Sequence, residues 1–192
     1  GNALSGHIKD AVNDAVQKVQ KTMAAKLKDL GGDDLAKEMQ DLIGIDGQAD
    51  FTLRRLALMA SQDYQKIFLF ALSDLDERAS VRDQHYGLLD LNGEPKPVYN
   101  ALARFLEITG PTLKPGATPV LKDVPKTLYS VAWTRNDGKR LLMYWSAEGT
   151  SITLPEVKNA ELLDPLTGAR QTLNDYNGIR PAVKPTLQIL VW

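Results

Sequence analysis

Apolar positions in the first part of the chain follow a helical period. From Leu4 to Leu30 they recur at spacings of three and four, with charged and amide residues between them. This spacing predicts one amphipathic helix, which Gly31-Gly32 would end. A second, shorter helix is expected from Asp33 to Ile43, closed by Gly44 and Gly47. Residues 1–48 are therefore interpreted as a helical pair.

The apolar stripe of the first helix suits three kinds of partner: the rest of the chain, a second copy in a coiled coil, or a membrane surface. Asp10, Asp14 and Asp29 lie among its lysines, which argues against an anionic membrane. Packing within the chain is the simplest of these interpretations.

Residues 49–112 show a different pattern. A third helix is predicted from Asp50 to about Gln62. The continuous apolar run 66–72 then predicts a strand buried on both faces, as in a parallel sheet covered by helices. The polar stretch 73–84 is expected to form a loop at the end of that strand. A last helix is expected from Val98 to Ile108.

From about Leu113 the pattern changes to short strands separated by turns. Strands are expected at Leu128–Trp133, Leu141–Trp145, Ser151–Leu154, Ala160–Leu163 and Thr186–Trp192. Asn136-Asp137-Gly138 predicts a hairpin turn, and the segment from Asp164 to Gly168 predicts another. We expect residues 113–192 to form an antiparallel β-sandwich, which makes the whole chain α+β.

Charge and composition narrow the classes of function. Lysine and arginine total 23 against 24 acidic residues, and the two signs are interleaved, so no electrostatic basis for binding nucleic acid exists. The longest apolar run, near Ile67 to Leu72, is far shorter than the roughly 20 residues that a membrane-spanning helix needs. We therefore expect neither a nucleic-acid partner nor a membrane span.

Cysteine is absent and His7 and His85 are the only histidines, which argues against disulfides, thiolate chemistry and a histidine-rich metal site. No phosphate-binding loop is present either, so no cofactor is expected. The chain starts at Gly1 without a basic leader or an apolar stretch. We interpret it as a trimmed chain whose signal peptide has been removed, and expect an extracellular or periplasmic protein.

Two phrases near the middle of the chain carry a family resemblance. His85-Tyr86-Gly87-Leu88-Leu89 is followed by Pro95-Lys96-Pro97-Val98-Tyr99 at the start of the last helix. From about Asp50 onward, this order of elements resembles the last β/α unit of TIM-barrel glycoside hydrolases together with their C-terminal β-sandwich. In such a barrel the two prolines would fix the backbone before the helix, and Tyr99 would plug the barrel end.

The part of the chain that resembles these hydrolases does not contain their catalytic carboxylates. Glycoside hydrolysis needs two carboxylates, which the resembled family carries on earlier strands in phrases such as Asn-Glu-Pro, and no such phrase occurs here. A whole barrel takes about 250 residues. Either the chain is part of a larger hydrolase, or it is a stand-alone relative that lost those strands. No catalytic residue is assigned, and no glycosidase activity is expected from these residues alone.

The candidate ligand contacts follow the predicted strand, where α/β folds bind their ligands. Carbohydrate-contacting candidates are Asp74, Asp76, Glu77, His85 and Tyr86, with Asp83 in the same loop. The alternative is a solvated loop whose acids are balanced by Arg78 and Arg82, and the sequence favours this alternative. A histidine that only holds its loop is likewise the commoner case.

Aromatic residues of the β-region suggest carbohydrate stacking, but a core position is expected for each tryptophan. Tyr144 and Trp145 are neighbours in one strand and point to opposite faces, so we expect only one of them to be buried.

The sequence as a whole indicates the C-terminal region of a glycoside-hydrolase-like, polysaccharide-processing protein. The alternative is a non-enzymatic carbohydrate-binding or protein-interaction module. An exposed aromatic strip on the β-region would favour the module, whereas a large uncovered apolar face would favour the hydrolase. The lone buried strand also predicts a homo-oligomer, because both of its edges need partners.

Overall fold

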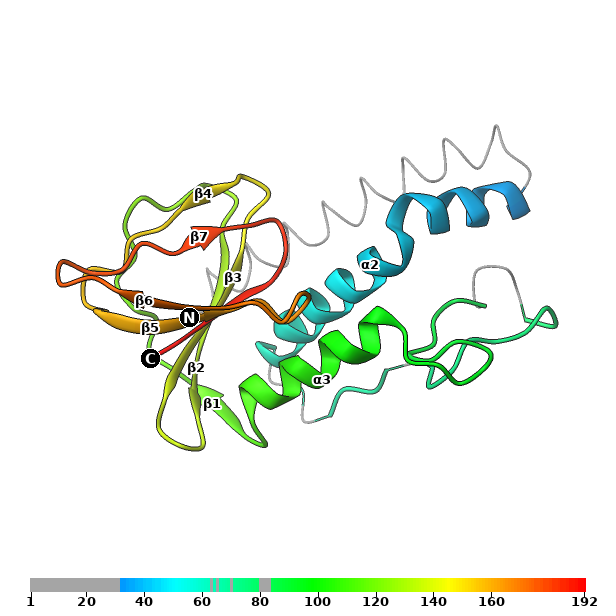
Figure 1. Cartoon of the computed structure of the whole chain (residues 1–192), viewed down its shortest axis with the longest axis horizontal. Coiled ribbons are helices and arrows are strands. Elements are labelled where there is room, and N and C mark those ends of the chain that lie inside the picture. Colours follow the sequence, from blue (N-terminus) through cyan, green and yellow to red (C-terminus); the bar gives the residue numbers. More distant parts are fainter. Residues whose placement is uncertain (1–31, 63, 65, 70, 80–83) are drawn as a thin grey trace.

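The computed structural model describes residues 32–62, 64, 66–69, 71–79 and 84–192. Two helices and an antiparallel sheet give an α+β fold, as predicted (Figure 1). The helices are α2, Gly32–Ala60, and α3, Pro97–Thr109. None of the helices in the described part of the chain combines the length and apolarity needed to cross a lipid bilayer.

The C-terminal part contains eight strands in two antiparallel sheets. They are β1 Leu113–Pro115, β2 Tyr129–Arg135, β3 Arg140–Trp145, β4 Thr150–Ser151, β5 Asn159–Leu163, β6 Arg170–Asn174, β7 Ala182–Val183 and β8 Gln188–Val191. Six of them form one sheet in the order β1-β2-β3-β8-β5-β6, and β4 pairs with β7. A second small sheet facing a larger one is consistent with a sandwich-like region. The sequence missed β1, β6 and β7, which are short or polar.

Turn chemistry explains the two predicted hairpins. In the turn between β2 and β3, Gly138 adopts a φ of 84°, and Arg135 pairs with Asp137 at 2.6 Å. In the turn between β5 and β6, the Gly168 amide donates to the Asp164 carbonyl at 2.8 Å. Gly168 has a φ of 78°, a backbone conformation that residues with a Cβ seldom adopt. Both hairpin predictions are confirmed.

Both faces of the six-stranded sheet are covered, which corrects one prediction. One face packs Trp145 and its neighbours against Leu53 of α2 and Phe105 of α3, while the other packs Tyr144 against the layer that contains Ile152. Tyr144 and Trp145 still point to opposite faces of the sheet, yet the two residues are only 0% and 4% exposed. The expectation that only one is buried was wrong, because a sheet covered on both faces buries both sets of side chains.

The first helix of the expected pair, Leu4 to Leu30, lies outside the described residues. The second helix meets the predicted third helix at Gly44, within the element Gly32–Ala60. Gly44 has a φ of 61° and a ψ of 177°, which are not helical values, so the helical backbone is interrupted at one of the two glycines predicted to close the second helix. Glycine tolerates that conformation because it has no Cβ.

The predicted buried strand at 66–72 is wrong. The structure has no strand there among the described residues, and Phe68 and Leu72 are 87% and 68% exposed. Ala71 and Leu72 still bond to the segment 86–89 through backbone groups. Among the described residues of this segment, backbone pairing with 86–89 is therefore found only at its end.

The helices and the main sheet share one hydrophobic core. Arg104 of α3 adds polar contacts, because its Nη1 donates to the carbonyls of Pro165 and Leu166 at 3.0 and 2.7 Å. Whether residues 1–112 and 113–192 fold as separate domains stays a prediction.

Candidate functional site

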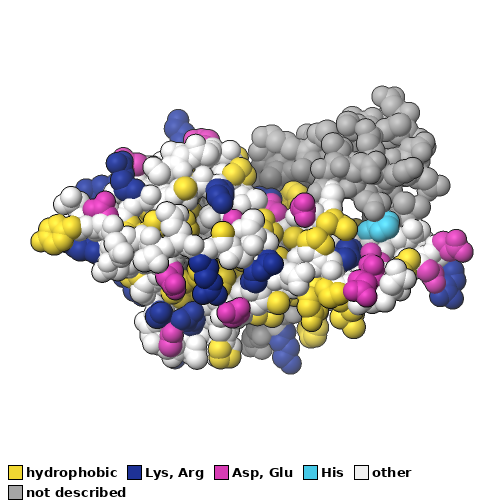
Figure 2. Space-filling model, in the orientation of Figure 1, with side chains coloured by type: hydrophobic (Ala, Val, Ile, Leu, Met, Phe, Trp, Pro, Cys, Tyr) yellow, Lys and Arg dark blue, Asp and Glu magenta, His cyan; other side chains and the backbone are white. Residues whose placement is uncertain are grey.

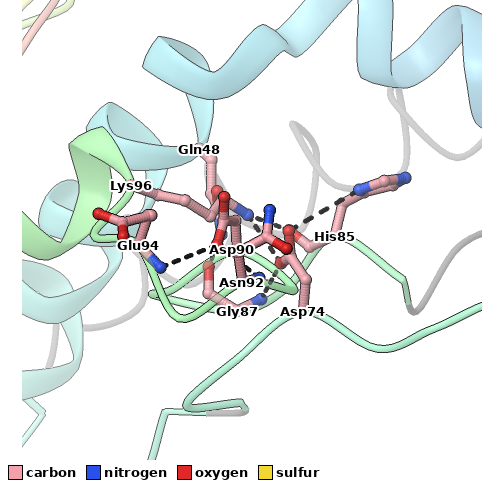
Figure 3. A network of polar contacts seen from close by, with 8 residues as sticks. All are labelled: Gln48, Asp74, His85, Gly87, Asp90, Asn92, Glu94 and Lys96. Atoms are coloured by element: carbon pink, nitrogen blue, oxygen red, sulfur yellow. Dashed lines mark hydrogen bonds and ion pairs between the residues drawn. The ribbon is translucent and has the colours of Figure 1, made fainter.

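A network of polar contacts organises the two loops between α2 and α3 (Figure 3). The segment that ends at Leu75 runs beside the segment from Gln84 to Leu89. Leu75 donates its amide to the Gln84 carbonyl at 3.0 Å, and Leu89 donates to Leu72 at the same distance. The chain thus returns along itself and brings residues on both sides of the loop together.

A buried ion pair lies at the centre of this network. Lys96 Nζ donates to Asp74 Oδ1 at 2.8 Å, and the two side chains are only 6% and 10% exposed. The same Oδ1 accepts the amide of Gly87 at 2.8 Å, and Lys96 Nζ also donates to the His85 carbonyl at 3.0 Å. These further hydrogen bonds meet the condition under which a buried pair stabilises its surroundings.

Lys96 connects the network to α3 because it is the residue that precedes the helix, with Pro97 at the first helical position. Its backbone amide donates to the Leu88 carbonyl at 3.0 Å. The proline is pre-set for a helical start, as expected from the Pro-Lys-Pro phrase. Tyr99, however, is 42% exposed, so its side chain does not fill a buried position in this chain.

Gly87 lies where two backbone segments nearly touch. A Cβ at this position would be 2.1 Å from the Asp74 amide nitrogen, so only glycine fits. Gln48 of α2 donates its Nε2 to the Gly87 carbonyl at 3.0 Å. The loop is therefore tied to both helices.

Asp90 builds the turn that follows. Its Oδ1 accepts the amides of Asn92 and Glu94, each at 2.8 Å, and Gly93 adopts a φ of 84°. This arrangement makes the Asn-Gly turn rigid.

The predicted site residues fall into two groups. Asp74 and His85 belong to the network, where His85 Nδ1 lies 4.0 Å from Asp74 Oδ2. Asp76 instead pairs with the exposed Arg78 at 2.6 Å, whose hydrogen bonds hold the pKa of Asp76 below its ordinary value. Glu77 is exposed beside them. The pairing of Asp76 with Arg78 and the exposure of Glu77 agree with the solvated alternative for this described part of the loop.

His85 and Tyr86 present their side chains outward, with the His85 side chain and the Tyr86 residue each 44% exposed. Asp83 and Arg82 lie outside the described residues. That any of the five candidates contacts carbohydrate stays a prediction. The sequence missed the roles of Lys96, Gln48 and Gly87, because a buried lysine and a close backbone approach leave no local pattern.

A second polar cluster lies between α2 and the sheet. Asp50 pairs with Arg54, whose Nη2 lies 2.7 Å from Asp50 Oδ2. Burial raises the pKa of Asp50, against the opposing effect of Arg54. Across the interface, burial alone would raise the pKa of Asp164, but bonds from Thr167 and Lys184 bring it below its ordinary value.

The tryptophans of the β-region do not form an exposed sugar platform. Trp133 and Trp145 are 6% and 4% exposed, and Tyr129 stacks on Trp145 with ring centroids 5.3 Å apart. Trp192 is partly buried beneath the guanidinium of Arg140. The core position expected for Trp133 and Trp145 is confirmed. Within the described ranges, no three acidic or histidine side chains gather as metal ligands would.

Comparison with known proteins finds a similar fold among solved structures. No protein-family model matches the sequence, and no curated protein does. Among solved structures, the chain is similar to a family 39 glycoside hydrolase from the gut symbiont Bacteroides cellulosilyticus WH2, with 20% identity and a TM-score of 0.55. The described fold is therefore similar to that of part of this glycoside hydrolase. The match covers 72% of this chain but only 29% of the hydrolase chain.

Proposed function

We propose that this chain is the C-terminal region of a glycoside-hydrolase-like, polysaccharide-processing protein. The catalytic carboxylates would lie on strands outside these 192 residues. The fold similarity supports the hydrolase part of the proposal. The assignment of this chain to one region of a larger protein rests on an uneven distribution of exposed apolar side chains.

Large exposed hydrophobic residues gather in the helical half of the molecule. Of thirteen such residues in the described part of the chain, ten lie between positions 45 and 106. They are Ile45, Phe51, Tyr64, Phe68, Leu69, Leu72, Tyr86, Leu91, Tyr99 and Leu106. Figure 2 shows hydrophobic side chains gathered over the region around the N-terminal end of α3 and the loops beside it. Exposure on this scale indicates a surface that another part of a protein covers.

The segment 66–72 shows which surface is uncovered. Phe68 and Leu72 are 87% and 68% exposed, Leu69 is 39% exposed, and Ile67 and Ala71 are partly buried. In a closed barrel, alternate residues of a strand point to the helices and to the packed interior. The exposure of this apolar segment supports a barrel strand on which Phe68 and Leu72 would face further strands.

Covering this face would stabilise the molecule appreciably. Burial of one leucine or phenylalanine side chain contributes about 1.5–3 kcal/mol, so Phe68 and Leu72 alone would favour assembly with the remaining strands. Among the described acids of the loop, Asp74 is held by Lys96 and Asp76 by Arg78, so neither is free to act as one of a catalytic pair. We therefore assign this chain a bracing role, with chemistry supplied elsewhere.

A hydrolysis assay tests the proposal. The native gene product, purified from the cells that make it, should release reducing ends from at least one polysaccharide of a neutral plant and microbial panel. The 192-residue chain alone should release none. Activity of the isolated chain, or a native product inactive on the whole panel, would contradict the proposal. The alternative of a carbohydrate-binding module has no support from Trp133 and Trp145, because both tryptophans are buried.

A further inference from the structure

The sequence contains two Asn-Gly pairs, and one of them lies in the turn before α3. Asn92 and Gly93 are both exposed there. The Gly93 amide donates to the Asp90 carbonyl at 3.1 Å, and the Asn92 amide donates to Asp90 Oδ1 at 2.8 Å. Among the described residues, no heavy atom beyond the chain neighbours of Gly93 lies within 4 Å of where its Cβ would be. The peptide between Asn92 and Gly93 therefore has free space beside it.

The second Asn-Gly pair has the same local hydrogen bonds in a different setting. The Gly178 amide donates to the Asp175 carbonyl at 3.1 Å, and the Asn177 amide donates to Asp175 Oδ1 at 2.9 Å. Gly178, however, is buried, and a Cβ on it would lie 2.5 Å from Pro155 Cα and 2.6 Å from the Leu154 carbonyl oxygen. Backbone from another segment therefore confines the peptide that follows Asn177.

We propose that Asn92 is a site of spontaneous deamidation and that the fold protects Asn177 from the same reaction. Hydroxide removes the Gly93 amide proton, and the nitrogen attacks Cγ of Asn92. The bond from Cγ to Nδ2 breaks, and Nδ2 takes up a proton and leaves as ammonia. Water then opens the cyclic imide at either carbonyl, which gives aspartate or isoaspartate. The reaction needs only water, so it is independent of the proposed function.

Burial of the glycine decides between the two sites. Glycine promotes ring closure at both, because it has no Cβ beside the attacking nitrogen. Closure rotates the peptide and ends the hydrogen bond of the glycine amide. At Gly93 this rotation disturbs only the exposed turn, and such local openings cost the least free energy in a folded protein. At Gly178 the same rotation must also displace the backbone of Leu154 and Pro155. We therefore expect the ring to close far more often at Asn92.

Isoaspartate at position 92 loosens the entry to α3, because it adds one carbon atom to the main chain of the turn. The Asp90 amide donates to the Glu94 carbonyl at 2.9 Å, and the Glu94 amide donates to Asp90 Oδ1 at 2.8 Å. The longer main chain cannot keep both contacts. Lys96 follows directly and forms the buried pair with Asp74 (Figure 3). The modification therefore weakens the turn that leads into this network.

The test follows both sites in the full chain by peptide mass spectrometry during incubation at neutral pH, with fragmentation that separates isoaspartate from aspartate. Asn92 should convert at least about tenfold faster than Asn177, because the exposed turn opens more easily. In concentrated urea, where neither turn is formed, the two rates should become similar. Asn92→Gln is the control: its longer side chain closes a ring slowly, so conversion at position 92 should be lost while Asn177 keeps its rate.

Equal conversion of the two sites in the folded chain, or faster conversion at Asn177, would overturn the proposal. A difference of about tenfold that persists in urea would overturn it too, since the local sequence would then set both rates. Hydrogen exchange at the Glu94 amide should be faster in chains that carry isoaspartate than in Asn92→Asp, which has the same charge on a normal main chain. Unchanged exchange would contradict the loosening of the α3 entry.

Discussion

At the scale of single residues, the pair formed by Asp74 and Lys96 does most to define the loops between the helices. A buried charge that loses its partner cannot recover its hydration, so removing one member costs far more than the pair itself contributes. We expect Lys96→Met to lower the free energy of unfolding by about 3–5 kcal/mol. Urea denaturation followed by circular dichroism measures the change.

The exposed pair of Asp76 and Arg78 provides the control for that experiment. Its members are 44% and 87% exposed, and solvent screens their attraction. Arg78→Ala should leave the denaturation midpoint unchanged. Equal losses in the two variants would contradict the burial described for Lys96.

Gly87 gives a second prediction at this scale. The Cβ introduced by Gly87→Ala would lie 2.1 Å from the Asp74 amide nitrogen and 2.2 Å from the Ser73 carbonyl carbon, and both atoms belong to backbone that cannot rotate away. We expect Gly87→Ala to lower the free energy of unfolding by about 1–3 kcal/mol or more, since overpacking of this kind forces backbone shifts. Gly149→Ala should be neutral in the same assay, because no atom lies within 4 Å of its Cβ position. A neutral Gly87→Ala would show that the loops do not approach each other so closely.

At the scale of elements, sequence patterns predicted correctly those features that depend on residues close together along the chain. The turn at Gly138 is set by local dihedral preferences, so its hairpin was predictable. The strand at 66–72 was not, because an apolar run is buried only if other elements cover it. The interruption of the helix at Gly44 was predictable, because its φ of 61° is one that glycine adopts readily. The Asp74–Lys96 contact joins positions 22 apart, which no local pattern encodes.

The interface between α2 and the sheet gives a pH-dependent prediction. The folded pKa of Asp50 is raised above its ordinary value of 3.8. The folded chain therefore binds this proton more tightly than the unfolded chain, and the contribution of Asp50 to stability falls as pH rises from 3.8 through the folded value. In Asp50→Asn this fall should disappear, so that stability relative to the wild type improves with rising pH across that window.

Asp164 on the opposite side of the interface should behave in the reverse sense. Its folded pKa lies below 3.8, so its stabilising contribution is present above 3.8 and is lost as pH falls through the folded value. Urea midpoints measured from pH 2.5 to pH 7 for Asp50→Asn, Asp164→Asn and the wild type separate the two effects. Identical pH profiles for all three proteins would contradict the interface described here.

At the scale of the whole molecule, the uncovered face of segment 66–72 should behave differently in two contexts. In the isolated chain, Phe68→Ser removes an 87% exposed phenylalanine and should raise solubility without lowering stability. In a complete hydrolase, the same side chain would be buried, and its loss should cost about 3–5 kcal/mol. Tyr176→Ser is the control, because an exposed tyrosine on the β-region should have little effect in either context. Equal effects of Phe68→Ser in both contexts would show that nothing covers this face.

The most direct test of the central claim is the intact mass of the native gene product in the cells that make it. The 192-residue chain has a mass of 21.2 kDa. We expect a considerably larger product, since a complete barrel alone takes about 250 residues. A native product of about the mass of this chain would contradict the assignment as a hydrolase region, and the exposed face around Phe68 would then need another partner.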